Sequence, residues 1–399
     1  MKLADLGVET VQLEISTLCN IRCTFCPIDL RGAPPSEFMS LAKAQRLLDE
    51  CARDGSLCFV GFQHLNEPLL HPKIEAILDY AHALKLQTYV CTNGTILTPR
   101  NVDLLARTSP TRLKVSVQDV NPETFNRVKG TRVEFSDFVR RVAALVERRL
   151  TDPGFTTRIE IDVAVPHLRS RRRKLLGLTH SDKTINDADA MLAHWLEEFL
   201  RTLESLAPSA KIDWSALTLD LRHIKTFRPD YVPTTVIGPG VSLELKGFFD
   251  WLGIDDHRPI RYGACPRLVQ LVINYRGDLQ LCCVDVHGKT SIGNVFTESL
   301  ADIIARPEGL AKLLRAPGYE LPTEYCRQCM GAPTRRGVAV LNVLNRAKHG
   351  HPAFVPEADR DPMVALGTLR RQEVGRRHPQ VVEAIDESLA RVFPRTIGG

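Results

Sequence analysis

Residues 13–27 read LEISTLCNIRCTFCP, and this stretch decides how the rest of the chain is interpreted. Residues 10–15 have the pattern of a strand, so Cys19, Cys23 and Cys26 fall in the loop that follows it. In α/β barrels, the loops at the carboxyl ends of the strands carry the chemistry. Three thiolates on one short loop can hold three irons of a four-iron, four-sulfur cluster, which leaves the fourth iron open to a cofactor or substrate.

The alternative for this loop is a structural zinc site or three buried thiols. A structural zinc site needs a fourth Cys or His ligand nearby. No Cys or His lies between Cys26 and Cys51, and the first histidine of the chain is His64. The spacing therefore favours an iron–sulfur cluster over zinc.

The first half of the chain alternates strand and helix patterns, which is typical of βα units around a parallel sheet. Amphipathic helices are expected between the strands, at 41–52, 73–84 and 135–148. The expected strands are 10–15, 57–62, 87–92, 112–118, 157–165 and 217–224. Six strands predict an α/β fold with a partial (β/α)6 barrel of the TIM type rather than a closed eight-unit barrel.

Composition divides the chain into four expected parts. They are a barrel at 1–224, a linker or lid rich in Pro, Gly and Asp at 225–264, a small cysteine-containing domain at 265–334, and a helical, basic tail at 335–399. The small domain begins with an expected hairpin, in which 268–275 and 279–284 flank the turn Arg276-Gly277-Asp278.

Charge and hydropathy indicate a cytoplasmic protein without a membrane partner. No apolar run reaches eighteen residues, and the N-terminus lacks a signal-peptide pattern. The net charge of +5, from 52 basic and 47 acidic residues, does not point to nucleic acid, and the basic run at 169–174 is typical of a solvated loop. In a reducing cytosol, eleven cysteines favour metal binding over disulfides.

The Cys-x-x-x-Cys-x-x-Cys spacing, with Phe25 before the last cysteine, resembles the signature loop of the radical SAM superfamily. Asn66 and Glu67 follow the second expected strand, where that family carries Gly-Gly-Glu-Pro; here Leu65-Asn66 replaces the two glycines. Further matches to that family are Asn93, which follows the third expected strand, and Ser116 and Gln118, which end the fourth. The resemblance implies that S-adenosylmethionine is contacted by Phe25, Asn66, Glu67, Asn93, Ser116 and Gln118.

This resemblance also implies a mechanism. S-adenosylmethionine would chelate the open iron of the 4Fe-4S cluster, and reductive cleavage would produce a 5′-deoxyadenosyl radical that abstracts hydrogen from the substrate. Glu67 would bind the methionine ammonium. An external one-electron reductant of the flavodoxin or ferredoxin type is expected as a partner.

A second cysteine set comprises Cys265, Cys282, Cys326 and Cys329. Spacing alone fits zinc and an iron–sulfur cluster equally. The region resembles the SPASM/twitch extension of radical SAM enzymes, and since no cysteine follows Cys329, the shorter twitch form with one auxiliary cluster, of the 4Fe-4S type, is implied.

Two details of the cysteines remain open. Cys283 could replace Cys282 as ligand, but strand alternation points their side chains in opposite directions, and we prefer Cys282. Cys51, Cys58 and Cys91 are expected to be buried structural thiols.

Three functions compete. A small polar metabolite, such as a sugar, nucleoside or aminoglycoside, is the expected substrate, for dehydrogenation, dehydration, decarboxylation or epimerisation. The reason is that the cluster loop begins within twenty residues of Met1, which leaves no fused peptide-docking domain. Maturation of a ribosomally made peptide is the alternative, and a structural metal-binding protein that contacts RNA is the third. No general acid or base is assigned among the polar candidates Asp119, Arg127, His223 and Arg261.

Overall fold

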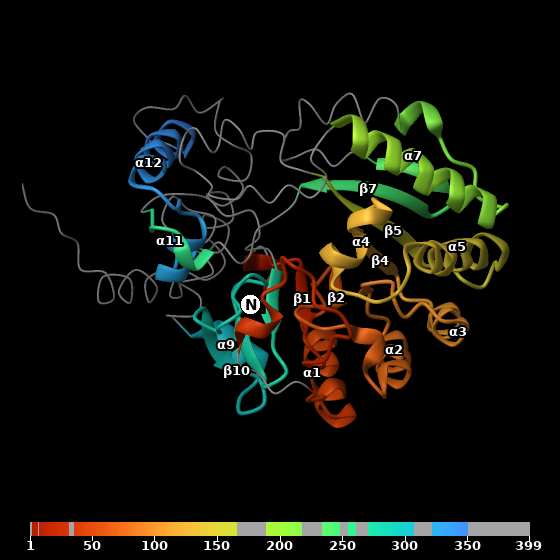
Figure 1. Cartoon of the computed structure of the whole chain (residues 1–399). Coiled ribbons are helices and arrows are strands. Elements are labelled where there is room, and N and C mark those ends of the chain that lie inside the picture. Colours follow the sequence, from red (N-terminus) through yellow and green to blue (C-terminus); the bar gives the residue numbers. More distant parts are fainter. Residues whose placement is uncertain are drawn as a thin grey trace, which may run out of the picture.

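The computed structural model describes residues 2–6, 8–31, 36–165, 189–217, 234–247, 254–260, 270–306 and 321–349 (Figure 1). Several sequence-based expectations lie outside these residues. They are the basic run at 169–174, nearly all of the strand expected at 217–224, Cys265, His223, Arg261 and the tail beyond His349.

One sheet of ten strands organises the described part of the chain, in the order β10-β9-β8-β1-β2-β3-β4-β5-β7-β6. Neighbouring strands are parallel from β8 to β7. The first five strands confirm the expected ones: β1 (Thr10–Leu13), β2 (Phe59–Phe62), β3 (Thr88–Thr92), β4 (Arg112–Gln118) and β5 (Arg158–Val165). The sheet has two open edges, so the fold is the predicted partial barrel.

The sixth strand differs from the prediction. It is β7 (Val241–Gly247), which pairs in parallel with β5 from Ile159–Val241 to Val165–Gly247 and forms a hairpin with β6 (Thr234–Gly238). The assignment of 225–264 to a linker or lid is therefore wrong for 234–247. Pro- and Gly-rich neighbours concealed an ordinary strand pattern, in which Ser242, Glu244 and Lys246 alternate with apolar residues.

Helices cover one face of the parallel strands. They are α1 (Leu41–Asp54), α2 (Ile74–Ala83), α3 (Pro99–Thr108), α4 (Pro122–Lys129), α5 (Phe135–Thr151) and α7 (Asp189–Leu206), with the 3₁₀ turns η1 (Leu3–Leu6), η2 (Ile28–Arg31) and η3 (Pro68–Leu70). The amphipathic helices expected at α1, α2 and α5 are confirmed.

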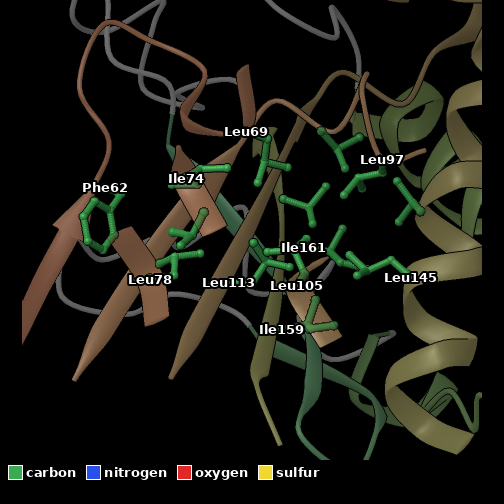
Figure 2. Close-up of a cluster of buried hydrophobic side chains, with 14 of the residues drawn as sticks. Phe62, Leu69, Ile74, Leu78, Leu97, Leu105, Leu113, Leu145, Ile159 and Ile161 are labelled. Atoms are coloured by element: carbon green, nitrogen blue, oxygen red, sulfur yellow. The ribbon is translucent and has the colours of Figure 1, made fainter. Parts of the chain in front are cut away.

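The hydrophobic core lies between these helices and the sheet. Figure 2 shows Leu113, Ile159 and Ile161 of the sheet beside Leu105 of α3 and Leu145 of α5. Because strand side chains alternate, burying these residues against the helices turns the intervening polar residues to the opposite face. The inner face of the barrel is therefore polar.

The cysteine-containing domain continues the barrel sheet. Its strand β8 (Gln270–Ile273) pairs with β1, and β9 (Asp278–Gln280) and β10 (Ser291–Asn294) follow in antiparallel fashion. The expected hairpin is thus confirmed, with shorter strands. The remaining elements are η5 (Ile254–Asp256), α9 (Leu300–Ala305), α11 (Glu324–Cys329) and α12 (Arg335–His349).

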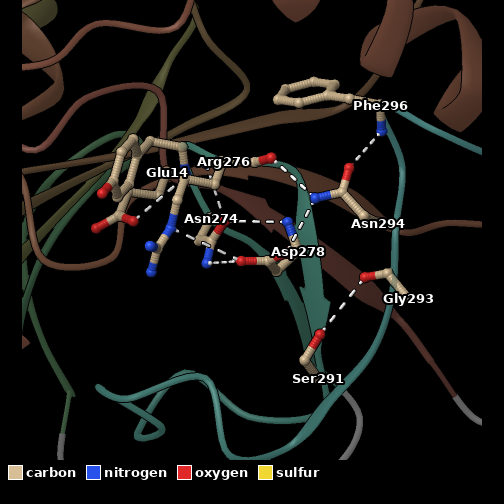
Figure 3. A network of polar contacts seen from close by, with 9 residues as sticks. Glu14, Asn274, Arg276, Asp278, Ser291, Gly293, Asn294 and Phe296 are labelled. Atoms are coloured by element: carbon tan, nitrogen blue, oxygen red, sulfur yellow. Dashed lines mark hydrogen bonds and ion pairs between the residues drawn. The ribbon is translucent and has the colours of Figure 1, made fainter.

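Side-chain amides lock the hairpin turn (Figure 3). Asn274 Oδ1 accepts hydrogen bonds from the backbone N–H groups of Arg276 and Asp278, at 2.9 and 3.0 Å. Asn294 Nδ2 donates to Asp278 Oδ1 at 2.9 Å, which ties β10 to the same turn. Gly277 occupies the turn with a φ of +91°, which other residues rarely adopt. These bonds fix the turn that follows β8, and Tyr275 N donates to Glu14 Oε2 at 3.4 Å, next to β1. No helix in the described part of the chain is long and apolar enough to cross a membrane.

Candidate active site

The three cysteines of the first loop line one cavity of about 440 Å³ on the polar side of the sheet. Five other residues that sequence motifs single out share this cavity: Phe25, Asn66, Asn93, Ser116 and Gln118. They come from loops and strand ends far apart in the sequence. The expected S-adenosylmethionine contacts are therefore brought together, with the exception of Glu67.

The cysteine loop is held against the C-terminal end of α4. Arg22 N donates to Gly130 O at 3.2 Å, and Thr24 N donates to Val128 O at 3.0 Å. Cys23 Sγ lies 3.5 Å from Lys129 O. These backbone contacts fix the loop that a short sequence motif alone leaves unplaced.

Asn93 connects the end of β3 to the cysteine loop. Its Nδ2 donates to Asn20 Oδ1 at 2.9 Å and lies 3.8 Å from Cys19 Sγ. Thr95 Oγ1 donates to Asn93 Oδ1 at 2.6 Å and accepts from Asn20 Nδ2 at 2.8 Å. Hydrogen bonds near cluster sulfurs tune cluster potentials, so Asn93 can act on the cluster as well as on a cofactor.

Glu67 is buried and binds backbone groups. Its Oε2 accepts from Asn93 N at 2.6 Å and its Oε1 from Leu69 N at 3.2 Å. Burial raises the pKa of its carboxyl to about 7, and the hydrogen bond from Asn93 opposes that shift. In this arrangement Glu67 positions the end of β3 rather than lining the cavity. Its direct contact with the methionine ammonium remains a proposal.

Burial also governs the loop thiols. It raises the pKa of Cys19, and that of Cys23 to about 11, while the nearby ammonium of Lys129 lowers the pKa of Cys23. Metal ligation needs thiolates, so binding of a cationic metal centre must displace these protons.

Donor chemistry fits a cluster in this loop. Within the described ranges, no three Cys, His, Asp or Glu side chains lie close enough together to hold a single metal ion. The three cysteines of the loop line one cavity, and cysteine thiolates are the ligands that hold a four-iron, four-sulfur cluster.

The second cysteine set is partly described. Cys282 is buried with Ile254, Val284 and Tyr325, and Cys283 and Cys329 pack against this group. Cys326 is buried in a neighbouring group with Ile260 and Leu321. Val284 N donates to Cys282 Sγ at 3.3 Å, and Thr323 Oγ1 to Cys326 Sγ at 3.2 Å.

The adjacent cysteines share one hydrophobic group but differ in their access to the cavity. Cys283 packs against the group around Tyr325 and also lines the cavity that contains the first cysteine loop, whereas Cys282 is buried within that group and does not line the cavity. This arrangement supports Cys282 as the auxiliary ligand, which remains a proposal together with the roles of Cys326, Cys329 and Cys265.

Asp285 organises the loop that carries Cys282. Its carboxylate accepts from Thr290 N at 2.5 Å, from Thr290 Oγ1 at 2.7 Å and from Lys289 N at 3.1 Å. The sequence alone assigns Asp285 no role. A buried aspartate close after two cysteines is the signal that could have indicated one.

His64 joins the barrel to the auxiliary domain and was missed as a site residue. Its Nδ1 lies 3.2 Å from Glu14 Oε1 and its Nε2 lies 3.0 Å from Cys283 O. The side chains of His64 and Glu14 are both buried. The ring therefore links the ends of β1 and β2 to the backbone of the second cysteine set.

Two expectations about the remaining cysteines need correction. Cys51 is buried in the core as expected, but Cys58 is exposed. Cys58 precedes β2 at its amino end, where the strand meets solvent. Cys91 is half-buried and lines the cavity, because its place on β3 puts it on the polar face.

Asp119 is a local structural residue in this arrangement. It accepts from Thr124 Oγ1 at 2.6 Å and from Asn121 N at 3.0 Å, just before α4. Burial raises the pKa of its carboxyl. Asp119 does not line the cavity, and Arg127 does not either.

A partial parallel barrel, with three cysteines after its first strand around a cavity at the inner face of the sheet, is the architecture of an iron–sulfur enzyme that uses S-adenosylmethionine. Two family models match the chain: the radical SAM superfamily over residues 13–160, and an iron–sulfur cluster-binding (SPASM) domain over 265–330. The chain belongs to the radical SAM superfamily, and its cofactors are S-adenosylmethionine, a 4Fe-4S cluster and auxiliary iron–sulfur chemistry in the SPASM domain.

The chain is similar to several individual proteins. The chain is 30% identical to the PqqA peptide cyclase of Xanthomonas axonopodis pv. citri over 330 residues, covering 80% of this chain and 79% of that protein. It is 31% identical to the AdoMet-dependent heme synthase of Methanosarcina barkeri over 119 residues, which span 29% of this chain and 33% of that protein. Among solved structures, anSMEcpe with bound AdoMet has a TM-score of 0.48 and 13% identity, covering 94% of this chain and 99% of that one.

Proposed function

We propose that this radical SAM enzyme modifies a ribosomally made peptide. The supporting observation is the similarity to PqqA peptide cyclase, which extends over four-fifths of both chains and so includes more than the barrel. This proposal replaces the small polar metabolite favoured from sequence, which rested on where the cluster loop begins.

In this proposal the cofactors supply the radical chemistry and the protein binds and orients them. When bound, the loop cluster and S-adenosylmethionine supply the electron transfer and the carbon-centred radical that abstracts hydrogen. Cys19, Cys23 and Cys26 would hold the cluster, and Asn93, Ser116 and Gln118 would orient the cofactor in the cavity. Bound substrate and cofactor would have to keep water and other hydrogen donors away from the radical, because the loop cysteines are only half-buried.

Two further features belong to the proposal. Cys282, Cys326 and Cys329, with Cys265, would hold one auxiliary cluster; Cys283, next to Cys282 in sequence, lines the cavity. An external flavodoxin- or ferredoxin-type protein would supply electrons.

The test is turnover under anaerobic conditions with reconstituted enzyme, dithionite and S-adenosylmethionine. The probes are a PqqA peptide and the short peptides encoded beside this gene, with glucosamine and adenosine as small-metabolite probes. We expect 5′-deoxyadenosine together with a mass change in a peptide, and neither with Cys23→Ala. A mass change in a small metabolite, with all peptides untouched, would contradict the proposal.

A further inference from the structure

Three charged side chains from three strands meet on the polar wall of the cavity. Lys114 Nζ of β4 lies 3.0 Å from Asp162 Oδ2 of β5, and Lys246 Nζ of β7 lies 3.1 Å from Asp162 Oδ1. All three residues line the cavity. Lys246 also pairs with Glu244, at 2.7 Å, which does not line it.

The cations of this group are the accessible part. The side chains of Lys114 and Lys246 are 18% and 32% exposed, whereas those of Asp162 and Glu244 are 9% and 10% exposed. The lysine side chains are therefore more accessible than the carboxylates with which they pair.

The two ammonium groups can form more than one interaction each. Each has three N–H donors. Lys114 pairs with Asp162 and lies over the Tyr89 ring, at 5.7 Å from its centroid, and Lys246 pairs with Asp162 and Glu244. The two ammonium groups share the single carboxylate of Asp162, so an anion in the cavity would find two positive charges side by side.

Stability does not explain this placement. Buried ion pairs seldom repay their desolvation, and apolar residues of similar volume are often at least as stabilising. The same strands pack Leu113, Ile161 and Leu245 on their other faces. A barrel interior needed only for packing would be filled with such residues.

We propose that Lys114 and Lys246 bind an anionic group of the substrate, a carboxylate or a phosphate, while Asp162 keeps the two ammonium groups together until that group arrives. The biological source of this anion rests on the proposed peptide substrate, whereas the chemistry by which the two lysines bind it does not. Lysine acts as a point charge and accepts either anion. The pair lies on β4 and β7, whereas Lys129 is the lysine that contacts the cysteine loop.

The test is binding by calorimetry to the anaerobic holoenzyme saturated with S-adenosylmethionine. The probes are N-acetylglutamate amide, its neutral isostere N-acetylglutamine amide, and inorganic phosphate. We expect at least one anionic probe to bind about tenfold more tightly than the glutamine probe. Lys114→Met and Lys246→Met should remove this preference, and Lys73→Met, at an exposed lysine, should keep it. Preference for the glutamate probe assigns the site to a carboxylate, and preference for phosphate assigns it to a phosphate.

Asp162→Asn separates this role from a structural one. Loss of the competing carboxylate should raise anion affinity several-fold, whereas a purely structural ion pair would leave probe binding unchanged or weaken it. Iron content and melting temperature of each variant confirm folding. Equal binding of all probes, or unchanged or weaker anion binding in Asp162→Asn, would overturn the inference. So would weaker S-adenosylmethionine binding in Lys114→Met, since the site would then belong to the cofactor. Because the probes bind without turnover, these outcomes are independent of whether a peptide is the substrate.

Discussion

Gly130 lies so close to Arg22 that no side chain fits between them. A Cβ on Gly130 would lie 1.8 Å from the carbonyl oxygen of Arg22, and Gly130 has a φ of +59°. Arg22 lies between Cys19 and Cys23 in sequence, so the cysteine loop packs directly against the C-terminal end of α4.

Gly130→Ala should displace this loop. Gly55 ends α1 with a φ of +63° and has only ordinary contact distances around its missing Cβ, so Gly55→Ala is the matched control. Both variants incur the left-handed penalty of about 1 kcal/mol. We expect only Gly130→Ala to lose iron from the loop and to slow S-adenosylmethionine cleavage by more than about tenfold. Iron analysis and 5′-deoxyadenosine assays measure these two effects. Equal behaviour of the two variants would contradict the claim that Gly130 positions the cysteine loop.

Cys23→Ala should abolish S-adenosylmethionine cleavage and leave the auxiliary cluster intact, because two thiolates cannot retain the loop cluster. Chromatography of 5′-deoxyadenosine and iron content are the measurements. Cys58→Ala, at an exposed thiol outside the cavity, is the control and should behave as the wild type. A normal cleavage rate in Cys23→Ala would show that the cluster assignment is wrong.

Cys326→Ala should have the opposite pattern. The thiol is buried in α11, in the hydrophobic group of Ile260 and Leu321. This group does not include the first cysteine loop. We therefore expect cleavage of S-adenosylmethionine to continue while product formation falls. Comparing 5′-deoxyadenosine with modified substrate in one reaction measures the uncoupling. Full turnover would mean that the auxiliary site is dispensable.

His64→Gln should weaken the connection between barrel and auxiliary domain. The substitution removes one of two contacts, to Glu14 or to the Cys283 carbonyl. Loss of a hydrogen bond to a buried charged group costs about 1–3 kcal/mol. We expect a lower melting temperature and an altered electron paramagnetic resonance signal of the auxiliary cluster. His82→Gln, at an exposed position on α2, should change neither; an unaltered signal in His64→Gln would argue against the connection.

Glu67 predicts a pH dependence of stability. Burial raises the pKa of its carboxyl from 4.5 to about 7, so between these values the folded protein holds a proton that the unfolded chain has lost. Stability from this group therefore falls as the pH rises, by about 1 kcal/mol between pH 6 and 8. The free energy of unfolding should therefore fall by about 1 kcal/mol more in the wild type than in Glu67→Gln between pH 6 and 8. Glu123→Gln, at an exposed position, should keep the wild-type slope, and parallel profiles for Glu67→Gln would exclude this role.

Local pattern determined much of this protein. The Cys19–Cys23–Cys26 loop, the strands from β1 to β5 and the hairpin that follows Cys265 are recognisable because each depends on residues close together in sequence. Residue type and spacing define thiolate donors, and period-two alternation defines strands.

Tertiary structure alone decided the rest. It made β7 the sixth barrel strand, paired β8 with β1, turned Glu67 onto the backbone of Asn93, and joined Lys114, Asp162 and Lys246 on one wall. These relationships depend on the order and register of strands that lie far apart in the chain. Alternation shows that a strand has two faces, but only sheet pairing decides which neighbours each face meets.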